Sequence, residues 1–203
     1  NGEFKAQVDY SFNRVTAQAA NITTYFLESG DRVITENRDG RDRSHTLSGK
    51  FIYEVNQKTT FINNTLSTNI DWDDVRLGVT GSLPNEQSAK LPDYYVANKF
   101  KMIKRFNGKH LITFQSNNEW ESLPQTLNVS LDGSTLSQHI GDHAFYTHES
   151  AAYAFSIKGI TVSLEGGVKG YLRSLNTELP DMPTELPGTT ENVLNTNYFT
   201  VYA

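Results

Sequence analysis

The feature that most constrains this chain is a strict alternation of residue types from Ile160 to Arg173. Starting at Ile160, every second position is apolar or glycine, and the positions between are polar or charged. Because successive side chains of a β-strand point to opposite faces, the stretch predicts a strand with one apolar and one polar face. The pattern lasts 14 residues. Strands of soluble domains usually have about 5–6 residues, and a membrane-spanning strand needs roughly 9–11. The pattern is therefore typical of an outer-membrane β-barrel strand.

Similar alternation recurs along the chain and predicts an all-β protein. We expect an antiparallel up-and-down meander of about nine long strands, forming part of a transmembrane β-barrel. The expected strands are Glu3–Phe12, Thr46–Val55, Thr59–Trp72, Leu91–Phe106, His110–Trp120, His143–Ile157, Ile160–Arg173 and a last strand starting near Val193, with a small hairpin of Thr126–Leu131 and Ser134–Ile140.

The connections between these strands are expected to alternate in length. Tight turns are predicted at 13–14, 56–58, 107–108 and 158–159. The pair Asn107-Gly108 is the strongest of these signals because both residues tolerate the positive φ of a type I′ turn. Long polar loops are predicted at about 28–43, 73–90, 121–142 and 174–192. Outer-membrane barrels alternate short periplasmic turns with long external loops, so this rhythm favours the same architecture.

Charge and composition narrow the function classes. The apolar positions of Glu3–Phe12, Thr46–Val55 and Ile160–Arg173 carry no charge. Both a lipid-facing wall and a sandwich core exclude charge, so a soluble β-sandwich or small β-barrel stays open as an alternative. The chain lacks an apolar run long enough for a membrane helix, and it has no cysteine. Its net charge of −5 argues against a nucleic-acid partner.

Three groups of side chains could in principle carry chemistry, and the two acidic groups are better explained as solvated rims. His139, His143 and His148 are spaced so that the last two fall on opposite faces of a strand. The two other groups are Asp71, Asp73 and Asp74, and the pair Glu119 and Glu121. We therefore predict no enzyme activity, no catalytic or cofactor-binding residues and no metal site, and the ligand-binding residues are left open.

The chain starts and stops inside strand patterns, at Phe4–Phe12 and at Asn197–Ala203. A complete domain seldom begins and ends in this way. We therefore expect residues 1–203 to be a segment of a barrel domain that is incomplete at both ends.

Three stretches go further and resemble a known family. They are NEWESLPQTLNVS at Asn118–Ser130, HAFYTHESAAYAFSIKGITVSLEGGVKGYLRSLN at His143–Asn176, and SLPNEQ…LPDYYVANKFKMIKRFNGKHLITFQS at Ser82–Ser116. Together with the strand rhythm, they resemble the barrel of TonB-dependent outer-membrane receptors. The likeness is to the receptor-like barrels of Bacteroidetes that carry a carboxypeptidase-like regulatory domain.

This resemblance implies a barrel of about 22 strands with an N-terminal plug. The plug and its TonB box are absent from these residues. The implied function is nutrient binding and uptake in the outer membrane of a Gram-negative bacterium, with substrate captured by the loops at 73–90, 121–142 and 174–192. The implied partners are outer-membrane lipid, the rest of the barrel and plug, a TonB-type energy-coupling protein and a surface lipoprotein. The alternatives are a soluble secreted module that binds glycan or protein, and a passive porin-like barrel.

Overall fold

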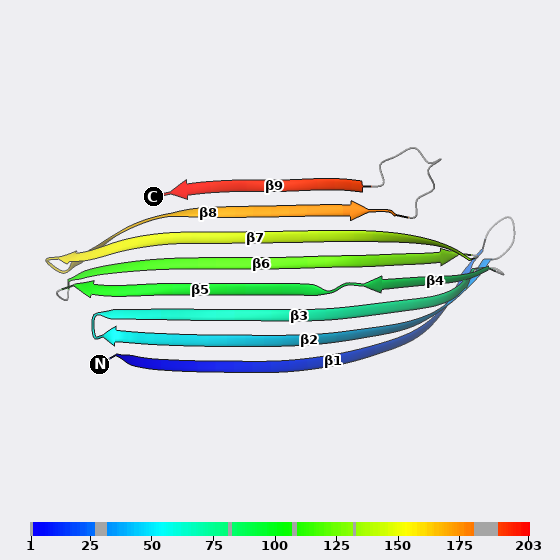
Figure 1. The fold of residues 1–203 in the computed structure, drawn as a ribbon, viewed down its shortest axis with the longest axis horizontal. Coiled ribbons are helices and arrows are strands. Elements are labelled where there is room, and N and C mark those ends of the chain that lie inside the picture. Colours follow the sequence, from blue (N-terminus) through cyan, green and yellow to red (C-terminus); the bar gives the residue numbers. More distant parts are fainter. Residues whose placement is uncertain (1, 27–31, 81–82, 107–108, 132, 181–190) are drawn as a thin grey trace.

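The computed structural model describes residues 2–26, 32–80, 83–106, 109–131, 133–180 and 191–203, and these form one antiparallel β-sheet (Figure 1). The predicted all-β antiparallel meander of about nine strands is confirmed. The strands are β1 (Glu3–Tyr25), β2 (Arg32–Asn56), β3 (Thr59–Thr80), β4 (Leu83–Lys90), β5 (Asp93–Phe106), β6 (His110–Leu131), β7 (Ser134–Ile157), β8 (Ile160–Glu178) and β9 (Glu191–Tyr202). Within the described residues no helix is long and apolar enough to cross a membrane.

Each strand pairs with its neighbours in sequence, apart from one interruption. Strands β4 and β5 lie end to end between β3 and β6, where Figure 1 shows them as a single broken line. Leu91 and Pro92 separate the two. Pro92 has no N–H to give to the ladder, whereas the Leu91 amide still donates to the Trp72 carbonyl over 2.8 Å. The sheet therefore keeps an up-and-down order across the break.

The hairpin turns partly agree with the sequence prediction. The connection at 56–58 is confirmed, and so is the turn at 158–159, where Lys158 and Gly159 have φ of 50° and 86°. The positive pair is the type I′ geometry that suits the twist of a two-residue hairpin. The hairpin of Thr126–Leu131 and Ser134–Ile140 is confirmed by pairing of Leu131 with Ser134. The predicted turn at Asn107-Gly108 lies outside the described residues.

The strands are much longer than the sequence predicted. Strand β1 continues through the expected turn at Asn13-Arg14, which pair with Ser44 and Arg43. Most of the predicted loops at 28–43, 73–90 and 121–142 is also strand, and β8 extends into the loop predicted at 174–192. These predictions were wrong because polar residues can continue a ladder through backbone hydrogen bonds without any apolar contrast. With 25 residues in β2, a strand reaches roughly 80 Å.

The register divides the sheet into two faces. Residues paired across neighbouring strands lie on one face, so Phe4, Tyr53, Phe61, Met102 and Phe114 share a side. We call it the apolar face, and it also carries Ile160 to Leu172 in alternation. The other side is the polar face. In β3 the apolar residues Ile62, Leu66 and Ile70, which alternation in the sequence groups on one side of the strand, fall on the polar face.

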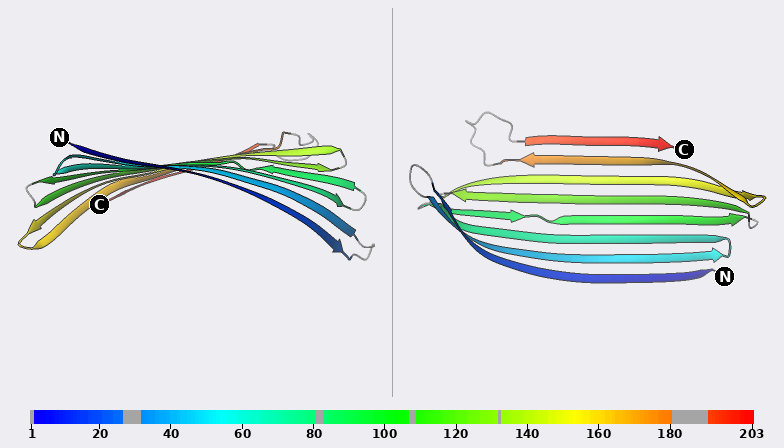
Figure 2. Two further views of the ribbon diagram at one scale, coloured as in Figure 1. Left: turned by 90° about the horizontal axis from the view of Figure 1, so that it is seen from below. Right: turned by 180° about the vertical axis from the view of Figure 1, so that it is seen from behind.

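The sheet has one layer and almost no core, as the edge view in Figure 2 shows. Among the described residues Ala97 is the one buried apolar side chain. Large side chains of the apolar face are open to solvent, with Phe4 63%, Leu164 64% and Phe199 66% exposed. A β-sandwich would bury such a face against a second sheet, and the described strands contain no second sheet. An exposed apolar face of this extent is typical of a surface that meets another protein or a membrane.

The outer strands β1 and β9 lie at opposite ends of the strand order and do not pair with each other within the described residues. Each thus presents one unpaired row of backbone groups.

Candidate binding face

A continuous line of hydrogen-bond donors crosses the polar face from β1 to β9. The register joins residues of eight strands into this line, which we call the donor row. Its members are Gln7, Lys50, Asn64, Lys99, Asn117, His148, Lys169 and Thr200. Every one can donate a hydrogen bond and none is a carboxylate. In a chain of net charge −5, such a row is a local excess of positive charge.

The lysines of the donor row are not neutralised within the described sheet. Lys50, Lys99 and Lys169 form no ion pair among these residues, and neither does the neighbouring Lys101. Lys5 shows the contrast, because its Nζ lies 3.1 Å from Glu3 Oε1 and 3.8 Å from Glu54 Oε1. Unpaired ammonium groups on one face favour the approach of an anion.

A hollow of about 430 Å³ lies over one end of the donor row. Lys50 and Lys99 line it from β2 and β5, with Asn64 of β3 between them. Leu66 and Tyr95 add apolar and aromatic surface, and the carboxylate of Asp9 also lines the hollow. The hollow thus combines cations, an amide and an aromatic ring on one side of the sheet.

Tyrosines adjoin the other end of the donor row. Tyr146, Tyr171 and Tyr198 are cross-strand neighbours in β7, β8 and β9, and we call them the tyrosine cluster. The rings of Tyr171 and Tyr198 are stacked, with centroids 5.5 Å apart and planes at 27°. The cluster lies two residues along each strand from the donor row, so its rings lie beside His148 and Lys169.

A fourth tyrosine, Tyr202, contacts both His148 and Lys169 at this end of the donor row. The hydroxyl of Tyr202 is 2.6 Å from His148 Nε2, and Lys169 Nζ lies 5.3 Å from the Tyr202 ring centroid. The ring can take this place because Gly167 lies opposite it, and a Cβ there would come within 2.7 Å of the Tyr202 hydroxyl. Cation–π contact and the hydrogen bond hold the three side chains in one arrangement.

Further along the polar face, ion pairs hold the ends of the strands. Asp74 is 4% exposed, and it accepts hydrogen bonds from Arg38 Nε at 2.7 Å and from Arg76 Nε at 3.2 Å. Burial of Asp74 raises the pKa of its carboxyl group, but the two guanidinium groups outweigh burial and lower that pKa below its usual value. Arg173 binds Asp142 through two bonds of 2.6 and 2.9 Å. Apart from Arg173, the charged residues of these pairs lie in segments that were predicted as loops.

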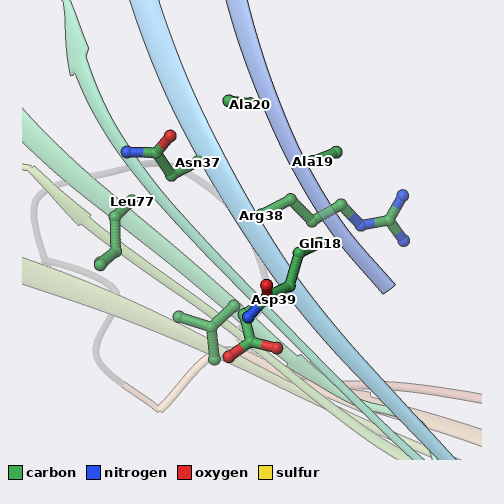
Figure 3. A pocket seen from close by; sticks show the side chains of 8 residues that line it. Gln18, Ala19, Ala20, Asn37, Arg38, Asp39 and Leu77 are labelled. Carbon is green, nitrogen blue, oxygen red and sulfur yellow. The ribbon is translucent and has the colours of Figure 1, made fainter. Parts of the chain in front are cut away.

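A second hollow, of about 540 Å³, lies near the same end of the sheet (Figure 3). Gln18, Ala20, Asn37, Asp39 and Leu77 contribute to it from β1, β2 and β3, and alternation puts these residues on the apolar-face side of each strand. Arg38, between Asn37 and Asp39, extends away from Leu77 in Figure 3. No cation of the donor row reaches this hollow, and we assign it no ligand.

Of the three groups singled out from sequence as possible chemistry, the structure divides the histidines and the aspartates between the two faces of the sheet and keeps the two glutamates on one face. His139 and His143 lie on the apolar-face side and His148 on the polar face. Asp71 and Asp73 face Arg43 at 3.4 and 3.3 Å, whereas Asp74 points to the other face. The described residues hold no cluster of side chains suited to a metal ion.

Glu119 and Glu121 share the polar face and lie beside Tyr95. In the described sheet no further carboxylate faces these two glutamates across a cleft. The interpretation of these two residues as rim charges stays a prediction.

The donor row was missed by sequence reasoning because each member lies in a different strand. Alternation already put Lys50 and Lys169 on polar faces, but it gives no register between strands. To find the row, one must know the register that places Lys50 opposite Asn64 and Asn64 opposite Lys99.

Some of the polar side chains on the apolar face bond to one another. Asn98 donates to Asn63 and Thr65 at 2.9 Å each, and Glu149 accepts from Ser116 at 2.7 Å. These side chains satisfy one another, which reduces the cost of placing them in apolar surroundings.

Comparisons with known proteins do not identify a family. No family model matches the chain, and no curated protein matches it. Among solved structures, the crystal structure of OccK10 (OpdN) from Pseudomonas aeruginosa is similar at 8% sequence identity, with a TM-score of 0.14 over 100% of this chain and 99% of that one. A likeness of this strength carries no argument about fold or function.

Proposed function

We propose that this chain is part of the wall of an outer-membrane β-barrel that binds and takes up a nutrient, as TonB-dependent receptors do. The observation that carries the proposal is the apolar face of the one-layer sheet. Leu164, for example, is 64% exposed in a strand with charged residues on its other side. Lipid tails would cover that face, because a barrel wall alternates lipid-facing and lumen-facing positions.

Two further features support the proposal. The strands are long enough to cross roughly 30 Å of hydrocarbon, even when tilted, and still extend beyond it. The two outer strands each have an unpaired edge in the described sheet. Closure with further strands removes such edges and satisfies their backbone groups, as a membrane requires. The polar face, with its donor row, would then line the lumen.

The experiment is expression of the protein in a Gram-negative host, followed by separation of inner and outer membranes. We expect the protein in the outer membrane, where it should need detergent for release. Recovery in the periplasm or medium without detergent would overturn the proposal in favour of a soluble module.

The type of transport is tested in the same cells. Uptake that stops when the TonB-type partner is deleted supports the receptor. Uptake that continues unchanged would instead support a passive porin-like barrel.

A further inference from the structure

We infer that the donor row and the tyrosine cluster together bind an acidic oligosaccharide, a chain of sugar rings that carries carboxylate groups. The inference deepens the proposed function by naming a substrate class, and it rests on that function for the route by which the ligand reaches the polar face. Its physical basis is independent, because it follows from the side chains and register alone.

The first step is charge. Three lysines and one histidine lie in one line, and the lysines have no ion-pair partner among the described residues. Neighbouring strands are about 4.8 Å apart, so the line presents its cations at intervals along an extended path across the strands. The matching ligand is elongated and carries several negative groups.

The second step is the amide side chains of the donor row. Asn64 lies between Lys50 and Lys99, and Asn117 lies between Lys99 and His148. Amide side chains donate and accept hydrogen bonds, which suits hydroxyl groups. A ligand in which carboxylates alternate with hydroxyls fits this order better than a polyphosphate, which offers no neutral donor.

The third step is the aromatic surface. The stacked rings of Tyr171 and Tyr198 lie beside Lys169, and Tyr202 is fixed by His148. Flat rings bind the C–H faces of sugars by dispersion contact while their hydroxyls bind polar groups. At the other end, Tyr95 borders the hollow that Lys50 and Lys99 line. Both ends of the donor row thus combine cation and aromatic ring.

The test is isothermal titration calorimetry on the protein purified in detergent micelles. The probe is an oligogalacturonate, which carries one carboxylate on each ring. The matched ligand control is the same oligomer with its carboxyl groups methyl-esterified, which keeps the rings and removes the charge. We expect binding of the acid, weaker binding at higher salt, and at least about tenfold weaker binding of the ester.

The variants are Lys99→Gln, Lys169→Gln and Tyr171→Leu, with Lys5→Gln as matched control. Lys5 is also on the polar face, but Glu3 and Glu54 already pair with it. Each donor-row variant is expected to weaken binding of the acidic oligomer by about 3- to 10-fold. Lys5→Gln should leave affinity unchanged. Tyr171→Leu should weaken binding of both the acid and the ester. An unchanged circular dichroism spectrum shows that each variant is folded.

Several outcomes overturn the inference. They are no binding of the acid, equal binding of acid and ester, or equal losses for Lys5→Gln and Lys99→Gln. Polyglutamate that binds as tightly as the oligogalacturonate also overturns it, and would assign the row to an acidic peptide segment. Binding in micelles needs neither membrane sorting nor energy coupling. Failure here therefore leaves the proposed barrel standing, and mislocalisation leaves a positive binding result standing.

Discussion

An arginine placed at Leu164 should destabilise the folded protein in a bilayer by about 2–4 kcal/mol, which is the cost of this charge at the midplane on the lipid side of a barrel strand. Leu164 lies near the middle of the alternating stretch and is 64% exposed. Little packing within the sheet is therefore lost. In water, a substitution at so exposed a site would cost no more than about 0.5 kcal/mol.

Two neighbours in β8 provide the controls. Ser163→Arg puts the same charge on the polar face, and we expect a change close to zero. Ile160→Arg lies at the Lys158-Gly159 turn on the apolar face, and it should cost about 0–1 kcal/mol, as lipid-facing sites near an interface do. A loss of unfolding free energy that decreases in the order Leu164, Ile160, Ser163 is expected if the apolar face meets lipid and Leu164 lies deepest in the membrane.

The assay is equilibrium unfolding by guanidinium chloride of the protein folded into phospholipid vesicles. A loss of 2–4 kcal/mol corresponds to a shift of roughly 30- to 1,000-fold in the folding equilibrium, well outside experimental error. Equal effects for the three variants, or an effect below about 0.5 kcal/mol for Leu164→Arg, would refute the assignment of this face to lipid.

Three other outcomes follow from the sheet. Asp74→Asn should destabilise the protein by about 1 kcal/mol at pH 7. The arginines lower the pKa of the Asp74 carboxyl group, so the stability that Asp74 contributes is complete above its usual pKa near 4 and is lost as the pH falls through the lowered pKa. The stabilities of wild type and variant should therefore converge when unfolding is measured in acid. Gly167→Ala should push a methyl group against the Glu149 carbonyl oxygen and the Tyr202 hydroxyl and lower the unfolding midpoint, whereas Gly141→Ala, whose nearest neighbour would be 3.9 Å away, should be close to neutral. The isolated 203-residue chain in detergent-free buffer should sediment as aggregates because its edges and apolar face are uncovered; a monomer that melts cooperatively would contradict this.

Alternation of apolar and polar residues was enough to predict nearly all of β5 and β7 but less than half of β1 and β2. Between Ile160 and Leu172, or Phe4 and Phe12, one face is apolar and the contrast is plain. The tight turn at Lys158-Gly159 was also readable because Gly favours positive φ.

The parts of the strands in which both faces carry polar residues were not predictable in this way. In the segment around Arg38 both faces carry polar residues, so period-two contrast disappears, and Gly40 and Asp39 resemble a turn. What holds that segment in the sheet is its backbone ladder and the pairing of Arg38 with Asp74, 36 residues away. The donor row depends on register in the same way, and register between distant strands is not contained in the pattern of any one of them.

The most direct test of the central claim is a spin-label scan along residues 160–173 of the protein in phospholipid vesicles. Labels are placed one at a time, and their accessibility to oxygen and to a water-soluble nickel complex is compared. We expect a period of two, with oxygen favoured at Leu164 and Val168 and nickel favoured at Glu165 and Lys169. The oxygen preference should peak near Leu164 and fall towards both ends of the scan. Equal accessibility at neighbouring positions, or nickel access along the whole stretch, would contradict the claim that this sheet is the wall of a membrane barrel.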